Sequence, residues 1–204
     1  QLSNFTTTSD NSGAKELWRG PWAGISRTNW ILSNIDKSPK ISDAKKTQYK
    51  GEAHFLRALY YFNLVRLFGD VPWIEKQQTA SDNLQVSRTS KDIVYQNIIN
   101  DLSDASSMLP AVYENSTDIG RATKGAAFGM LAKVYLTLKK YNETLVAIDS
   151  VTNLGVYSLN RKYEWNFDDT RENGPESLFE VQYEKDVTAY AEFDILGQGG
   201  WHHE

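Results

Sequence analysis

The sequence has 204 residues, of which 40% are hydrophobic, and its formal net charge at pH 7 is −4. This length and hydrophobic content support one folded domain with a sizeable core, and they argue against a disordered chain. The lack of cysteine excludes disulfides, thiolate catalysis and cysteine-ligated metal, while the acidic balance and the scattered lysines and arginines argue against a nucleic-acid partner.

The first two predicted helices are long and rich in apolar residues. Residues 14–35 form a helix with an inward apolar face, interrupted or bent at Gly20-Pro21 because proline cannot donate a backbone hydrogen bond. A polar turn follows at residues 36–43. Residues 44–68 form the longest helix, and its second half is apolar on nearly all sides, which predicts a central helix packed on two faces. Gly69 and Pro72 end it.

A third helix is predicted after a polar loop at residues 75–87. Thr89 and Asp92 have the spacing of a capping box, which satisfies free amide groups at a helix start. Apolar residues then recur at helical spacing as far as Leu109, and Pro110 ends the helix.

Residues 121–157 have the spacing of one tetratricopeptide (TPR) repeat, which is a pair of antiparallel helices. In the first helix the pattern is met by Phe128, Leu131, Ala132 and Tyr135. The second helix is expected to start at Asn142 as N-cap, to direct Leu145, Ile148, Val151 and Thr152 into the core, and to end at Gly155. One repeat cannot bury its own apolar face, so further helix pairs are expected.

The pattern changes after Gly155. Phe179, Val181 and Tyr183 alternate with Leu178, Glu180 and Gln182, which is the spacing of a β-strand. The last residues, 197–204, are expected to be a glycine-rich loop. The sequence therefore predicts a mainly α fold of TPR-like helix pairs over residues 14–154, followed by a short irregular or β region at 155–204.

Four stretches, in this order, resemble the SusD/RagB family of outer-membrane glycan-binding lipoproteins from Bacteroidetes-type bacteria. They are WAGISRTNWILSNI at 22–35, GEAHFLRALYYFNLVRLFGDVPW at 51–73, GRATKGAAFGMLAKVYL at 120–136 and YEWNFDDTRENGPESLFEVQY at 163–183. The resemblance extends from about Trp18 to Tyr183. Members of that family are usually more than twice this length, so we expect an N-terminal-half fragment without the lipidated cysteine, which the start at Gln1-Leu2-Ser3 also indicates.

The resemblance implies a function without catalysis. Such a protein would sit on the outer membrane through a lipid anchor that this chain lacks, bind an oligosaccharide or polysaccharide, and deliver it to a SusC-like TonB-dependent transporter. The helical side would pack against the transporter, and loops elsewhere would hold the glycan. No cofactor is implied.

Sugar binding by stacking needs exposed aromatic faces beside amide, carboxylate or guanidinium groups. Trp201 fits best, because it lies in the glycine-rich tail near Gln198 and His202. Trp73 follows a turn, where it either packs under the loop or forms a ligand platform. The other tryptophans with helical spacing, Trp18, Trp22 and Trp30, are expected to be structural.

Three charged residues within the resembling stretches are expected to support the fold rather than bind ligand: Arg57, Asp70 and Arg121. A buried arginine needs a carboxylate partner, and Glu52 or Asp70 is the candidate. His54 lies on the central helix and is read as a core histidine with satisfied hydrogen bonds.

Enzyme and metal readings find less support. Asp168, Asp169, Glu172 and Glu176 have the composition of an acid/base pair for glycoside hydrolysis, but a solvated turn is favoured, with weak calcium binding next. His202 and His203 at the chain end are read as an exposed loop. Two alternatives to glycan uptake stay open: a helical-repeat adaptor for protein partners, and a SusD-like binder of a non-glycan nutrient such as peptide.

Overall fold

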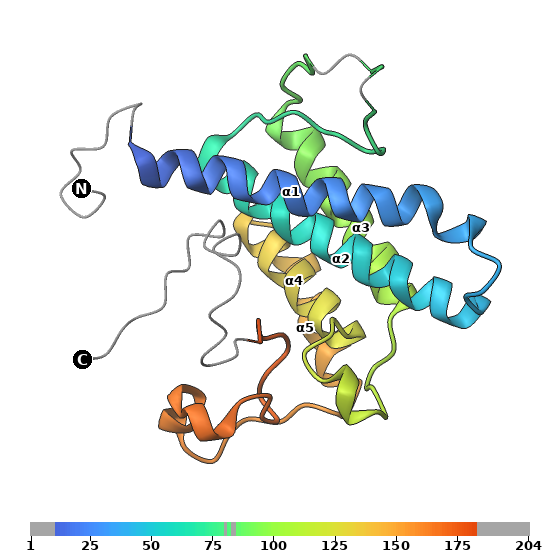
Figure 1. The fold of residues 1–204 in the computed structure, drawn as a ribbon. Helices are drawn as coiled ribbons and strands as arrows, with labels where there is room; N and C mark the ends of the chain where they lie inside the picture. The colour runs from blue at the N-terminus through green and yellow to red at the C-terminus, as the bar shows by residue number, and fades with distance from the viewer. Residues whose placement is uncertain (1–10, 80, 83–84, 183–204) are drawn as a thin grey trace.

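The computed structural model describes residues 11–79, 81–82 and 85–182, and this part of the chain is mainly helical (Figure 1). Each α-helix packs on the next in chain order. The α-helices are α1 (Ser12–Asn34), α2 (Asp43–Phe68), α3 (Lys91–Met108), α4 (Lys124–Thr137) and α5 (Tyr141–Thr152), and the short 3-10 helices are η2 (Ile35–Lys37), η3 (Ser116–Asp118), η4 (Tyr163–Phe167) and η5 (Asp169–Arg171). The predicted mainly α fold is confirmed.

Helix α2 lies at the centre of the core. Both α1 and α3 pack against it, which accounts for a sequence that is apolar on nearly all sides. Burial of each large apolar side chain stabilises the fold by about 1.5–3 kcal/mol. The helix ends at Gly69, whose φ of +69° is a conformation that L side chains rarely adopt. The buried apolar side chains of α2 are Ala53, Phe55, Ala58, Tyr61, Phe62, Leu64 and Val65.

Helix α1 is continuous through Pro21, so of the two expectations for this position, an interruption or a bend, the interruption is wrong. Proline removes only one backbone hydrogen bond, and both Gly20 and Pro21 are buried by packing, which compensates for that loss. The helix begins after Asn11, whose side chain accepts a hydrogen bond from the Ala14 amide at 3.0 Å.

The start of α3 is capped by a residue from the preceding linker. Asp70 Oδ1 accepts a hydrogen bond from the Lys91 amide at 2.8 Å, whereas the N-cap residue Ser90 makes no side-chain cap. The predicted capping box at Thr89 is wrong, because Thr89 bonds elsewhere: its amide donates to the Val71 carbonyl, and its hydroxyl accepts from the Trp73 amide. An acceptor distant in sequence has therefore replaced the local one.

Replacing Asp70 with alanine is expected to lower the free energy of unfolding by about 1 kcal/mol, because an amide at the α3 start loses its acceptor. Urea denaturation followed by circular dichroism measures this difference. Asp92→Ala is the matched control, since Asp92 belongs to the expected box but is exposed. A larger loss for the control than for Asp70→Ala would show that the cap is wrongly assigned.

Helices α4 and α5 form the predicted antiparallel pair, but α5 buries fewer side chains than expected. Its buried residues are Thr144 and Ala147, while Leu145 is 60% exposed and Ile148 is 46% exposed. Among the described elements α5 packs mainly on α4, so only one face of α5 is covered. The predicted burial of Leu145 and Ile148 is wrong within this part of the chain, because no described element covers their side of α5.

The predicted boundaries of α5 are partly correct. The helix begins at Tyr141, and its N-cap residue is Lys140 rather than Asn142, without a side-chain hydrogen bond. Lys139 lies in the short turn between α4 and α5 and has a φ of +59°, which is not a helical conformation. The chain reverses direction at this turn, so α5 starts directly after it. Gly155, with a φ of +68°, follows the end of the helix as expected.

The segment after Gly155 is irregular up to residue 182. It holds η4 and η5, and it contains no β-strand within the described residues, so the predicted strand at 178–183 is wrong where it can be compared. Alternation alone does not make a strand when no neighbouring strand is present to pair with it. Phe179 instead packs edge-to-face on Phe55 of α2, with ring centroids 4.9 Å apart.

Candidate functional site

The charged groups at the centre of the helical stack form a closed network. Arg57 on α2 donates from Nε and Nη2 to both carboxylate oxygens of Asp101 on α3, at 2.8 and 2.7 Å. Its Nη1 donates to the Asn29 side chain on α1 and to the Glu75 carbonyl. Glu52 and Asp70 are the carboxylates expected to pair with a buried arginine. For Arg57 neither does, because Asp101, 44 residues along the chain, takes this place, whereas Glu52 pairs with Arg121.

This network is buried and electrostatically balanced. Burial alone would lower the pKa of Arg57, but the hydrogen bonds and the negative charge of Asp101 outweigh it, so the pKa is raised and the guanidinium stays charged. Arg57 and Asp101 are each about 5% exposed. The charged and polar groups of the network bond one another, so they link α1, α2 and α3. Because they are also shielded from solvent, they offer no surface to a ligand.

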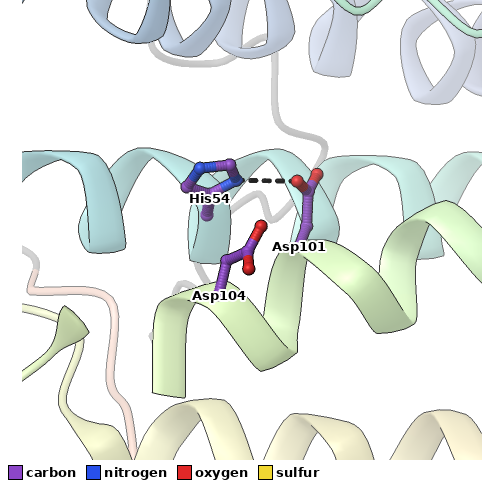
Figure 2. A group of neighbouring side chains, drawn as sticks. All are labelled: His54, Asp101 and Asp104. Carbon is purple, nitrogen blue, oxygen red and sulfur yellow. Dashed lines mark hydrogen bonds and ion pairs between the residues drawn. The ribbon is translucent and has the colours of Figure 1, made fainter. Parts of the chain in front are cut away.

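His54, Asp101 and Asp104 lie close together, with ligand-type atoms within 4.8 Å of one another (Figure 2). Figure 2 shows His54 on α2 facing Asp101, and their contact, Nδ1 to Oδ1, is 2.7 Å. Since the Asp101 carboxylate is an acceptor, His54 Nδ1 carries the proton in this bond. A metal ion at this carboxylate would have to displace Arg57 or lie beside its positive charge. The cluster is therefore a link between α2 and α3.

The tryptophans before residue 80 have different environments. Trp18 packs edge-to-face on Phe68, and Trp73 lies against Tyr61 with ring centroids 4.1 Å apart and with the Arg57 guanidinium 5.6 Å above its ring. The structure thus places Trp73 in packing contacts under the loop. Trp30 differs from the expectation of a structural role, because it is 56% exposed on α1.

Arg121 holds the loop before α4 to helix α2. Its Nη1 lies 2.7 Å from Glu52 Oε2, and its Nε lies 2.8 Å from Asp118 Oδ1. Tyr113 donates to Glu52 Oε1 at 3.0 Å, and burial together with this carboxylate raises the tyrosine pKa. A hollow of about 270 Å³ lies beside this loop. Several of its polar groups already bond one another, as Thr123 does with the Tyr157 hydroxyl at 2.8 Å.

Among the described residues after α5, the most exposed aromatic side chains lie on η4. Tyr163 is 77% exposed and Phe167 is 73% exposed, and their rings meet edge-to-face with centroids 5.3 Å apart. They are four positions apart in the sequence. Next to them, Trp165 lies under the guanidinium of Arg171, at 4.3 Å from the ring centroid. Such rigid exposed rings are suited to stacking on the apolar face of a sugar.

A hollow of about 420 Å³ lies beside η4 and η5 and is called here the η4–η5 hollow. The rings of Trp165 and Phe167 line it, and most of its other lining residues have amide or carboxylate side chains. Glu176 Oε2 accepts hydrogen bonds from the backbone amide of Asn160 at 2.9 Å and from the side-chain Nδ2 of Asn166 at 3.2 Å. The side chains of Asn160 and Asn166 are also bonded, at 2.6 Å. This chain of hydrogen bonds fixes the orientation of donors and acceptors, which is a requirement for recognising hydroxyl groups.

Each carboxylate oxygen of Asp168, which lines the same hollow, already accepts at least one hydrogen bond. Its Oδ1 accepts from the amide and hydroxyl of Thr170, and its Oδ2 lies 3.0 Å from Arg171 Nε. The hydrogen bonds from Thr170, with a smaller effect of Arg171, lower the pKa of Asp168. A calcium ion bound by Asp168 would have to compete with these donors for the carboxylate.

Comparison with known proteins adds the family. The sequence profile of a family described as "starch-binding associating with outer membrane" matches residues 1–136. The chain belongs to this SusD-like family. A SusD-like protein of Bacteroides ovatus is 31% identical over 197 residues, which cover 90% of this chain and 35% of the relative. The SusD-like chain thus spans about a third of the length of the curated relatives it matches.

Solved SusD-like structures have the same helical architecture. A SusD-like protein from Bacteroides fragilis superposes with a TM-score of 0.78 and 34% identity over 85% of this chain and 34% of its own. A laminarin-binding SusD-like protein gives a TM-score of 0.75 and 28% identity, over 80% of this chain and 36% of its own. Because each superposition covers only about a third of the solved relative, it shows that this chain has the helical part of the SusD-like fold.

The structure brings few of the predicted site residues together. Trp73 lies against the Arg57 network, whereas Trp201, Gln198 and His202 lie outside the described residues. The η4 aromatics were not among the predicted binding residues. Their signal in the sequence is the spacing Tyr163-x3-Phe167 within a polar turn, where no apolar stripe continues on either side to bury them.

Proposed function

We propose that the protein binds an oligosaccharide or polysaccharide at the outer membrane without altering it, and that the η4–η5 hollow contributes to the binding. The observation that supports this most directly is the exposed pair Tyr163 and Phe167 beside oriented amide groups, in a chain of a starch-binding family. Exposing the apolar faces of two large rings to water is unfavourable in free energy, and stacking on a sugar would bury these faces.

The test is affinity electrophoresis of the protein through gels that contain single polysaccharides, including starch and laminarin. A bound glycan retards migration, and calorimetry then gives the dissociation constant. Tyr163→Ala/Phe167→Ala is expected to weaken binding at least tenfold, because both stacking faces are lost. Trp201→Ala, measured alongside, tests the tail residue that the sequence favours.

Trp30→Ala is the matched control, since Trp30 is also a large exposed aromatic residue but lies on α1. It is expected to leave the affinity unchanged. Equal weakening by the control and by the double variant would contradict a site at η4. If no glycan retards the protein, a search for bound peptides or protein partners would follow, which are the ligands of the two alternative functions.

We also propose that the protein faces the cell exterior and passes its glycan to a SusC-like TonB-dependent transporter. Membership of a family associated with the outer membrane supports this. No helix in the described part of the chain is both long and apolar enough to span a bilayer. Purification of the tagged protein from solubilised outer membranes is expected to recover such a transporter, and repeated recovery without one would contradict the partnership.

A further inference from the structure

The walls of the η4–η5 hollow carry more negative than positive charge. The carboxylates among its lining residues are Asp168, Glu172, Glu176 and Glu180, and the one basic side chain among the same lining residues is Arg171. A ligand in this hollow therefore meets several acceptors for hydroxyl groups and little positive potential.

The charge of Arg171 is already balanced by its neighbours. Its Nε lies 3.0 Å from Asp168 Oδ2, and its guanidinium covers the face of Trp165 at 4.3 Å. The pair of Arg171 and Asp168 has no net charge, so the remaining carboxylates determine the potential of the hollow. Rotation of Arg171 toward an anionic ligand would break both of these contacts.

We infer that the hollow selects neutral glycans over glycans that carry carboxylate or sulfate groups. This inference rests on the proposed function. Sugar hydroxyls donate hydrogen bonds to carboxylates, whereas a ligand anion is repelled by them. In water, each carboxylate about 6 Å from a ligand anion weakens binding by about threefold. At physiological ionic strength the Debye length is about 8 Å, so the discrimination is strongest in low salt.

The experiment compares three forms of one neutral polysaccharide that retards the protein: the unmodified form, a hydroxyethyl derivative and a carboxymethyl derivative. The hydroxyethyl groups reproduce the bulk of the modification without its charge. In low salt with a chelator present, we expect the first two forms to bind with similar affinity and the carboxymethyl form to bind at least tenfold more weakly. Added sodium chloride should narrow this gap.

Glu172→Gln/Glu180→Gln removes two charges from the hollow while keeping the side-chain shapes. It is expected to raise the affinity for the carboxymethyl form relative to the hydroxyethyl form by about ninefold, that is, threefold for each charge, while the loss of two hydroxyl acceptors weakens binding of both forms alike. Glu143→Gln/Asp149→Asn on α5 is the charge-matched control, because neither residue lines the hollow. It should change neither affinity.

The outcomes separate the two proposals. Equal affinity of the native protein for the carboxymethyl and hydroxyethyl forms would overturn charge selection while glycan binding stands. An unchanged ratio of the carboxymethyl to the hydroxyethyl affinity in the Glu172→Gln/Glu180→Gln variant would also overturn it, provided that the variant melts like the native protein. Absence of binding to every neutral polysaccharide would overturn the proposed function itself, and charge selection with it.

Discussion

Replacing Asp101 with alanine is expected to lower the free energy of unfolding by about 3–5 kcal/mol, a loss typical of a broken buried ion pair. The variant leaves the guanidinium of Arg57 buried without its carboxylate, and it removes the acceptor of His54 Nδ1. Chemical denaturation followed by circular dichroism measures the effect.

Asp104→Ala is the matched control for this prediction. Asp104 lies on the same helix, one turn further along, but it is exposed. Its replacement is expected to change stability by less than about 0.5 kcal/mol, as for most surface sites. A double variant, Arg57→Met/Asp101→Leu, should recover part of the loss, because it removes both charges together. Similar destabilisation by Asp101→Ala and Asp104→Ala would contradict the assigned network.

Stability is also expected to fall steeply above pH 10 because of Tyr61. Burial raises the pKa of this tyrosine well above its ordinary value of 10.0, so the unfolded chain loses the phenolic proton before the folded protein does. The contribution is fully present below pH 10 and is lost as the pH rises toward the folded pKa. Between these values the free energy of unfolding should decrease by about 1.4 kcal/mol for each pH unit.

Tyr61→Phe identifies the source of this slope. The variant cannot ionise at this position. Above pH 10 the decrease of its unfolding free energy with pH should therefore be smaller than that of the native protein by the amount that one titrating proton contributes. It also removes the acceptor for the Ile74 amide, now 2.7 Å from the Tyr61 hydroxyl, so its stability near pH 7 should be lower. Equal slopes for the variant and the native protein, measured by denaturation at several pH values, would show that another group is responsible.

Local patterns in the sequence were enough to predict the helices. Apolar spacing and the glycines at 69 and 155 placed α2, α4 and α5 to within a few residues. The partners across the fold could not be predicted in this way. Asp101 pairs with Arg57 and Asp70 caps α3 because residues 44 and 21 positions apart meet in the fold, and no local periodicity encodes these contacts.

The candidate site was harder to predict than the fold for a physical reason. In the sequence, an aromatic residue that stacks on a ligand is indistinguishable from one that fills a core. Tyr163 and Trp73 both occur near turns, yet Tyr163 is exposed and Trp73 packs against Tyr61 and Arg57. Only the residues that surround each ring distinguish the two cases, and these residues can be far away in the sequence. Beside Trp73, for example, the Ile74 carbonyl accepts a hydrogen bond from Asn29, 45 positions earlier.

The linker between α2 and α3 is closed at its base. Asp70 accepts a hydrogen bond from the Lys91 amide, and the Val71 carbonyl accepts one from the Thr89 amide. These contacts hold the two ends of the linker together independently of the length and sequence of the loop between them. For a loop closed in this way, doubling the number of residues costs only about 0.6 kcal/mol in chain entropy. Insertions and deletions between residues 76 and 87 can thus accumulate during evolution and reshape this surface, while the helical scaffold keeps its geometry.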